Sequence, residues 1–519
     1  SKGISMPRMG KLLIILWFIG ICGGMGSSQF ISQAQKMTKN PPKKVPKIWD
    51  DKLLATWSLP LAGIGAKPHY VSEKEYYALP VDNLRTYPVY HPDFEPKGYR
   101  EWLKQQGAQL LIEPEKIQTE ADWVQAGQRV FDELDVPETR SDDPVILAYI
   151  SNREVLKRDG LNMTKEGILP ALRWVVDRDG KLKISLPECT GCHVRVMDNG
   201  MLIRGAQGNE NLAFEGAGIL FGKAFERIGK SGRELLPLPA HLYASYGVPW
   251  IKNDIHKRIK TMTDEEAGQL DLSFARGEVH RFNGSPYYPT KIPDLNGIKD
   301  RRYLDNTGTH LNRGPEDLAR YAILVSRVDA NRVGPYQFLT PKQRVALFRY
   351  SDEAMYALGK YLWTLEPPPS PYPFDELAAR GQQIFDQQAC ATCHAPPFYT
   401  SNKLTPAIEF IPPKAHLKQY DIFPASVGTD SGLALKTRKG TGYYKVPSLR
   451  GLWYRGPFEH SGSIATLEDW FDPKRLRDDY VPTGWKGPGV TSRAVKGHTF
   501  GLDLSPEDKR ALIAFLKTL

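Results

Sequence analysis

The chain has 519 residues, of which 41% are hydrophobic and 25% charged, enough for two or three ordinary domains with a sizeable core. This composition excludes an intrinsically disordered chain, a collagen and a polytopic membrane protein. The formal net charge is +10, but no nucleic-acid-binding motif accompanies the basic residues, so we expect no nucleic acid as a partner.

The first 34 residues have the layout of a secretory signal peptide. Basic residues precede an apolar run from Leu12 to Cys22, and small residues follow up to Ala34. The apolar run alone is too short to span a bilayer, so an uncleaved anchor would need the softer stretch to Ile31. We therefore predict a signal peptide or N-terminal anchor over residues 1–34. The protein would then be periplasmic or secreted, and such an anchor would be its only membrane contact.

Four cysteines lie in two copies of the pattern C-x-x-C-H, which is the attachment signature of c-type haem. The two thiols of each copy can add to the two vinyl groups of one porphyrin, and the adjacent His is then aimed at the iron as proximal ligand. A disulfide hairpin or a redox C-x-x-C would require a His after both copies by chance. We predict two covalently bound haem c groups. The predicted haem-binding residues are Cys189, Cys192 and His193 in the first motif, and Cys390, Cys393 and His394 in the second.

The sequence around the two motifs repeats, which predicts two copies of one domain. Residues 127–132 (Gly-Gln-Arg-Val-Phe-Asp) match residues 381–386 (Gly-Gln-Gln-Ile-Phe-Asp), and residues 291–298 match residues 445–452 in the same register. In the second half the first of these segments leads almost directly into the haem motif. In the first half a long stretch intervenes, so we expect an inserted subdomain there.

Each half also closes with a predicted helix. Ser505 as N-cap and Pro506 at the first helical position begin the last helix, and residues 357–365 are its counterpart in the first half. Prolines then forbid a continuous helix. We predict a mainly α fold with two cytochrome c-like domains. The predicted divisions are an N-terminal extension (35–118), a first cytochrome c domain with an insertion (119–365), a Pro-rich linker (366–374) and a second cytochrome c domain (375–519).

The axial ligands decide what each haem can do, because a six-coordinate iron mainly transfers electrons whereas an open distal face can bind oxygen or peroxide. The methionines end at Met355, so the second half offers no Met ligand, and its later histidines are His416, His460 and His498. We favour His498, in a Gly-flanked loop before the last helix, as the second ligand of the His394 haem. His460 is the rival.

For the first haem no residue takes a position that the repeat makes special, since Asn306 stands where the second half has His460. We therefore predict an open distal face. The haem of His193 is then the catalytic centre and the haem of His394 the electron relay. The distal candidates weighed are Met197, Met201, Met262, His256, His280 and His310.

Residues 444–450 (Tyr-Lys-Val-Pro-Ser-Leu-Arg), 456–462 and 466–468 resemble the C-terminal signature of bacterial dihaem cytochrome c peroxidases and of MauG. The distal Met or Tyr of those enzymes falls on Lys474 here. The Thr-x-Pro stretch that helps them to hold a calcium ion between the domains reads Arg455-Gly-Pro457. Calcium is left open as a further cofactor.

The stretch 293–307 and the Gly-His near the C-terminus are similar to the dihaem rubber oxygenases, a branch of the same superfamily. In that family a Gly-His supplies the second ligand of the second haem, which matches His498. The resemblance implies that the first haem binds dioxygen and that an apolar, alkene-type substrate is cleaved above it.

Three functions remain open. An oxygenase acting on an apolar alkene predicts a dry aromatic pocket. A peroxidase reducing H2O2 with electrons from a small cytochrome or cupredoxin predicts an acid/base group, for which Glu278, His280 and His310 are available. A non-catalytic electron carrier needs a hidden ligand over the first haem. The aromatic candidates are Trp250, Phe282, Tyr287, Tyr288 and Tyr303.

Overall fold

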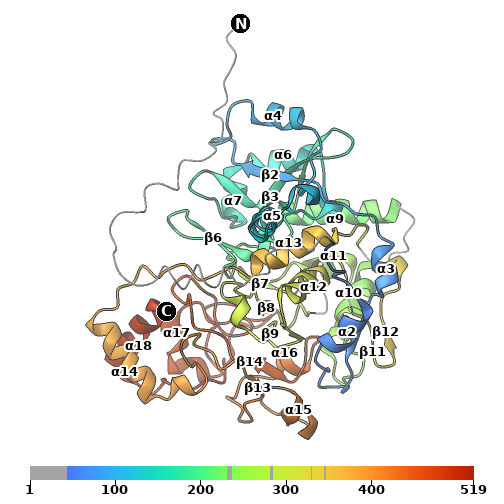
Figure 1. Cartoon of the computed structure of the whole chain (residues 1–519). Helices are drawn as coiled ribbons and strands as arrows, with labels where there is room; N and C mark the ends of the chain where they lie inside the picture. The colour runs from blue at the N-terminus through green and yellow to red at the C-terminus, as the bar shows by residue number, and fades with distance from the viewer. Residues whose placement is uncertain (1–43, 231–235, 281–283, 329, 344–345) are drawn as a thin grey trace.

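The computed structural model describes residues 44–230, 236–280, 284–328, 330–343 and 346–519 (Figure 1). The predicted signal or anchor segment, residues 1–34, lies outside these ranges. Among the described residues, no helix has both the length and the hydrophobicity needed to cross a bilayer. The fold is helix-rich, and its strands form only small sheets of two or three strands.

Two helix pairs pack in matching ways in the two halves of the chain (Figure 1). In the first half α5 (Glu120–Glu133) packs on α13 (Asp352–Leu362). In the second half α14 (Glu376–Gln387) packs on α18 (Pro506–Thr518). Ser505 caps α18 by accepting a hydrogen bond from the Asp508 amide, which confirms the predicted start of the last helix.

A matched glycine allows the close approach within each pair. A Cβ added to Gly127 would lie 1.9 Å from the carbonyl oxygen of Ala357, and a Cβ added to Gly381 would lie 1.9 Å from that of Ala511. These glycines occupy the same position in the repeated segments 127–132 and 381–386. Any side chain there would force the helices apart. The repeat in the sequence is therefore a repeat in the helix packing.

An aromatic contact is also repeated at the two crossings. The rings of Phe131 and Tyr361 are 5.5 Å apart between centroids, and those of Phe385 and Phe515 are 5.4 Å apart. Between the two pairs, residues 366–374 form no helix, as the prolines predict.

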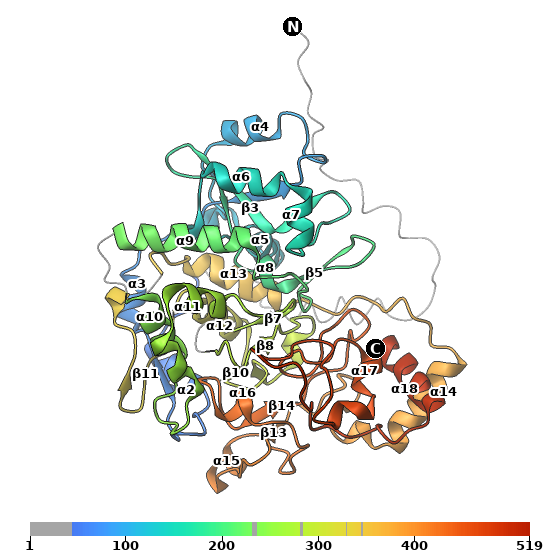
Figure 2. The ribbon, with the colours of Figure 1, turned by 180° about the vertical axis from the view of Figure 1, so that it is seen from behind.

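The N-terminal extension and the inserted part of the first half share one antiparallel sheet (Figure 2). Its strands are β2 (Thr86–Tyr90), β3 (Ile168–Val176) and β4 (Leu182–Ser185), with β3 in the centre. Almost all of β3 is buried. Around it lie α4 (Tyr99–Gln106) and α6 (Pro144–Ile150). The extension is thus built into the first half instead of standing apart from it.

The remaining elements connect these parts. The helices are α2 (Asp51–Trp57), α3 (Glu73–Tyr77), α7 (Arg153–Arg158), α8 (Thr190–His193), α9 (Glu215–Lys230), α10 (Leu238–Tyr246), α11 (Asp264–Asp271), α12 (Pro315–Ser326), α15 (Lys414–Gln419), α16 (Gly432–Leu435) and α17 (Leu467–Trp470). The strands are β1 (Pro68–Tyr70), β5 (Val194–Val196), β6 (Leu202–Arg204), β7 (Glu278–Val279), β8 (Thr290–Lys291), β9 (Tyr303–Leu304), β10 (His310–Leu311), β11 (Ala330–Val333), β12 (Tyr336–Gln337), β13 (Leu404–Pro406) and β14 (Tyr443–Lys445).

Candidate haem sites

The histidines of both C-x-x-C-H motifs are held by a proline carbonyl. His193 Nδ1 lies 3.2 Å from the carbonyl oxygen of Pro293, and His394 Nδ1 lies 3.1 Å from that of Pro447. The two prolines are matched positions in the repeated segments. Since a carbonyl oxygen can only accept, each Nδ1 carries the proton, and Nε2 keeps its lone pair for a metal ion.

A cavity of about 370 Å³ surrounds the second motif. Cys390, Cys393 and His394 line it together with His498, which lies far along the chain. The rest of the wall is largely apolar. It includes Phe385, Leu452, Phe458, Trp470, Phe471, Leu512 and Leu516.

The rings of His394 and His498 lie 6.3 Å apart between centroids. Two imidazoles bound to one metal ion through bonds of about 2 Å have centroids about 6 Å apart. Burial lowers the pKa of both rings to about 4, so both are in the neutral, metal-binding form at pH 7. The cavity therefore has the thiols, the facing imidazoles and the apolar walls that a covalently attached haem requires.

The backbone of His498 adopts a left-handed conformation, with φ 46°, directly after Gly497 with φ 88°. Arg475 stabilises this loop by donating to the carbonyl oxygens of Val495 at 2.7 Å, Gly497 at 3.0 Å and His498 at 2.7 Å. The Arg475 residue is only 1% exposed. Sequence reasoning missed it, because nothing local separates it from exposed Arg477 in the same charged run.

The rival ligand, His460, also lines the cavity, but carboxylates face both of its ring nitrogens. Its Nε2 lies 3.2 Å from Asp430 Oδ2, and its Nδ1 is in close contact with Glu459. Lys474, which takes the position of the distal ligand of the peroxidases, is exposed. Between the two histidines, the geometry favours His498.

In the first half, all three candidate histidines use both ring nitrogens in other contacts. Each nitrogen lies 2.6–2.8 Å from a hydroxyl, carboxylate or carbonyl oxygen. The pairs are His256 with Asp254 and Ser285, His280 with Tyr246 and the Asp271 carbonyl, and His310 with Tyr70 and Thr309. Of the candidate methionines, Met197 and Met262 pack in hydrophobic clusters and Met201 is 45% exposed. The three histidines are thus engaged in hydrogen bonds or ion pairs, and the three methionines are packed in clusters or exposed, so none of the six stands out as a distal ligand.

The aromatic residues proposed for a substrate pocket do not form one cluster. Tyr287 and Tyr288 pack with the residues of α10, Tyr303 packs in a different cluster, and the ring of Trp250 lies 5.7 Å from that of Tyr336, tilted by 46°. Phe282 lies outside the described residues. The described aromatics thus pack in separate hydrophobic clusters and do not line one shared pocket.

Among the three acid/base candidates, Glu278 has a polar side-chain atom without a hydrogen-bond partner, whereas both ring nitrogens of His280 and His310 are engaged. Glu278 is 0% exposed, its Oε1 has no hydrogen-bond partner, and burial raises its pKa to about 9. A Cβ added to the preceding Gly277 would lie 3.1 Å from the Gly208 carbonyl oxygen, and one on Gly208 would lie 2.1 Å from that of Cys192. The backbone before Glu278 thus packs toward the first motif, while Glu278 Oε1 lies beside Gly462 of the second half, 2.6 Å from where a Cβ on that glycine would stand.

The surroundings of Arg455 do not suit a calcium ion. Arg455 Nε lies 3.6 Å from Asp294 Oδ2, and Lys291, Arg301 and Lys445 line the same space. A divalent cation requires an excess of oxygen ligands there, whereas this region carries an excess of positive charge.

No protein-family model matches the chain. Methylamine utilization protein MauG of Methylorubrum extorquens is 33% identical over 76 residues, which are 15% of this chain and 18% of that protein. Cytochrome-c peroxidase IdrP1 of Denitromonas iodatirespirans is 30% identical over 92 residues, 17% of this chain and 22% of that protein. The matched segments thus span about a fifth of each relative's length.

Two solved structures were also found. Hydrazine synthase of Kuenenia stuttgartiensis, pressurised with xenon, is 13% identical, with 55% of this chain and 93% of that chain covered and a TM-score of 0.29. A MauG-like protein associated with microbial copper homeostasis is 15% identical, with 57% and 88% covered and a TM-score of 0.29. These TM-scores are too low to support an argument.

The sequence matches indicate a haem oxidoreductase. They support a relationship to the MauG and cytochrome c peroxidase superfamily, with c-type haem as the implied cofactor. The narrower resemblance to the rubber oxygenases depends on the sequence motifs alone.

Proposed function

We propose that the chain is an exported dihaem c-type oxidoreductase, periplasmic or secreted, in which the haem at His394 relays electrons and the haem at His193 is the catalytic centre. When bound, the two haems supply one-electron redox chemistry and an iron that can bind oxygen or peroxide. The observation that carries the proposal is the 6.3 Å separation of the His394 and His498 rings, which suits one iron held from both sides.

The side chains around the two motifs suit the two halves to different roles. His394 and His498 would together hold the iron of a haem bound in the second site, which would leave no position there for a substrate. The Pro293 carbonyl orients His193, and the candidate distal histidines of the first half are engaged elsewhere. This difference favours electron transfer in the second half and chemistry in the first.

The reaction that the geometry favours is reduction of hydrogen peroxide. It consumes H2O2, two electrons and two protons and yields two waters, and a small cytochrome or cupredoxin would supply the electrons. Glu278 is suited to donate a proton, because its raised pKa keeps the carboxyl protonated up to about pH 9.

A Glu278→Gln variant tests this role. The amide keeps the shape of the side chain but cannot donate and recover a proton, so we expect kcat for peroxide reduction to fall about 10²-fold or more. In the unmodified protein the activity should decline as the pH rises through about 9. Unchanged kcat and an unchanged pH profile in the variant would exclude Glu278 as the proton donor.

The second candidate is oxidative cleavage of an apolar alkene-type substrate, in which O2 adds one oxygen atom to each carbon of a double bond and gives two carbonyl products. The observation that favours it is the position of His498 opposite His394. His498 lies in the Gly-His loop that resembles the rubber oxygenases, and that resemblance implies alkene cleavage. Incubation with polyisoprene and with peroxide, in parallel, separates the two reactions.

Low-temperature EPR of the air-oxidised protein tests the division between the halves. We expect one low-spin bis-His haem beside one haem that is high-spin or oxygen-bound. Cyanide or imidazole should change only the signal of the high-spin or oxygen-bound haem at His193. Two low-spin signals that both persist with added cyanide would contradict an open first site in the protein as isolated.

A further inference from the structure

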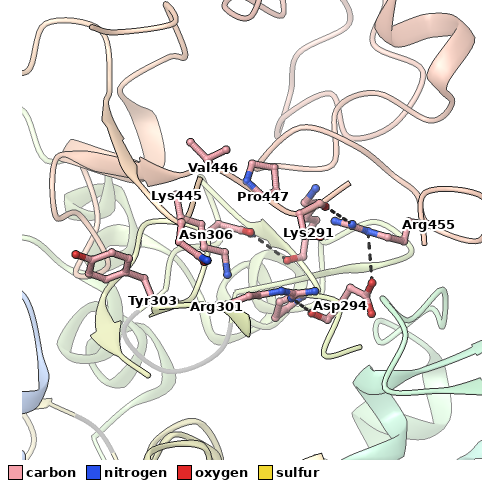
Figure 3. Close-up of a pocket in the computed structure, with 12 residues that line it drawn as sticks. Lys291, Asp294, Arg301, Tyr303, Asn306, Lys445, Val446, Pro447 and Arg455 are labelled. Carbon is pink, nitrogen blue, oxygen red and sulfur yellow. Dashed lines mark hydrogen bonds and ion pairs between the residues drawn. The ribbon is translucent and has the colours of Figure 1, made fainter. Parts of the chain in front are cut away.

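A small polar cavity of about 30 Å³ lies where the repeated segments 291–298 and 445–452 meet (Figure 3). Four cationic side chains line it. Lys291 and Arg301 come from the first half, and Lys445 and Arg455 come from the second. Asp294 is the single carboxylate among the residues that line this cavity, so its walls carry a clear excess of positive charge.

These cations are only partly paired. Arg455 Nε lies 3.6 Å from Asp294 Oδ2, and both arginines donate to backbone carbonyl oxygens through their other nitrogens. In the described part of the chain, neither Lys291 Nζ nor Lys445 Nζ has a hydrogen bond or an ion pair. The Nε atoms of Arg301 and Arg455 are buried without a hydrogen-bond partner. Burial, reinforced by the neighbouring cations, lowers the pKa of both lysines to about 7. Unpaired buried charge is costly, so an anion in this cavity would stabilise the protein.

The polar cavity and the large cavity around Cys390 adjoin each other and share lining residues. Lys291, Lys445 and Arg455 are among the residues that line both. The large cavity is therefore apolar around the cysteines and cationic at this end. A haem c group has the same polarity, since its macrocycle and thioether edge are apolar and its opposite edge carries two propionate carboxylates.

We infer that Lys291, Lys445 and Arg455 bind the propionate carboxylates of the haem attached at Cys390 and Cys393. This inference rests on the proposed function, because it requires a covalent haem in that cavity. Ammonium and guanidinium groups donate charge-assisted hydrogen bonds to carboxylates, which neutralises both partners.

The position of Lys291 gives this contact a second consequence. Lys291 belongs to the first half, in strand β8, while the haem cysteines belong to the second. The propionates thus tie the two halves of the chain together. The cationic groups also favour the reduced form of the haem, because reduction lowers the positive charge on the iron.

The test compares Lys291→Gln and Lys445→Gln with Lys418→Gln, which removes a charge at an exposed position. The mass of the chain and its pyridine haemochrome spectrum first establish that haem is attached. Redox titration of the low-spin haem and the resonance Raman propionate bending modes are then measured. We expect each cavity variant to lower the reduced-to-oxidised ratio at a fixed potential about tenfold, which is about 59 mV for one electron, and to shift a propionate band. Lys418→Gln should change neither.

The outcomes separate the two proposals. A chain without covalent haem would overturn the proposed function itself. Attached haem with unshifted propionate bands in both cavity variants would overturn the propionate contact alone, even if the potential fell through longer-range electrostatics. Should the Gln variants fail to fold, Lys291→Arg and Lys445→Arg retain the charge. They should shift the propionate bands with little change in potential, and unshifted bands in both would likewise overturn the contact.

Discussion

The two halves of this molecule share a frame and differ in what is built on it. Both have a helix pair crossing at a glycine, and both hold the motif histidine through a proline carbonyl. In the second half a loop before the last helix brings His498 to 6.3 Å from His394. In the first half the three candidate histidines contact other partners through both ring nitrogens. The comparison teaches that the repeated segments orient the motif histidine. Under the proposed function, the unrepeated loops then decide whether a site transfers electrons or performs chemistry.

The most direct way to break this difference is to remove the second imidazole. A His498→Ala variant should lose the low-spin bis-His signal almost completely, because the His394 haem would have one protein ligand left. The matched control is His416→Ala, a half-buried histidine of the same half that contacts Tyr443. Low-temperature EPR and cyanide binding measure both. A low-spin signal that survives in His498→Ala would show that another group, such as His460, is the ligand.

The shared frame can be tested at its glycines. Gly127→Ala and Gly381→Ala each place a methyl group 1.9 Å from a helix carbonyl, so the helices must separate. Overpacking of this kind costs about 1–3 kcal/mol, and we expect similar losses in the two halves. Gly222→Ala in α9 is the control, because its Cβ would meet no atom within 4 Å and alanine favours a helix by about 1 kcal/mol. Thermal unfolding followed by circular dichroism measures all three. A variant at either crossing that behaves like Gly222→Ala would contradict the close packing.

The parts of the fold and site that could be predicted from the sequence are those encoded locally. The C-x-x-C-H spacing specifies a thiol pair and a histidine on one turn. Gly127 and Gly381 stand out because each begins a repeated segment with Gln, Phe and Asp at matched positions, and Ser505-Pro506 carries its own capping signal. His498 could be proposed because few histidines remained and glycine precedes it.

The rest depends on contacts between distant segments. The sheet shared by β2 and β3 joins residues about 80 positions apart. The hydrophobic pattern of a strand does not indicate which other strand pairs with it, so this pairing could not be predicted. Glu278 gains its raised pKa from burial that the whole fold creates. The aromatic residues that appeared to suit one pocket are distributed among separate clusters, since composition alone does not say which side chains meet.

Arg475 provides the subtlest test of the difference between the halves. It holds three carbonyl oxygens of the His498 loop but touches no predicted haem thiol, so it is a positioning residue. An Arg475→Gln variant should keep haem attached yet loosen the left-handed His498 backbone, which costs about 1–3 kcal/mol to maintain. We expect a minor high-spin fraction at the second haem and faster cyanide binding there, with Arg477→Gln as the exposed control. Arg475→Lys should recover little, because one ammonium cannot reproduce the planar fork that reaches all three carbonyls. If Arg475→Gln left the spin state and the cyanide rate unchanged, backbone hydrogen bonds, such as those from the His498 amide to Val427 and from the Val495 amide to residue 475, would suffice to hold the loop.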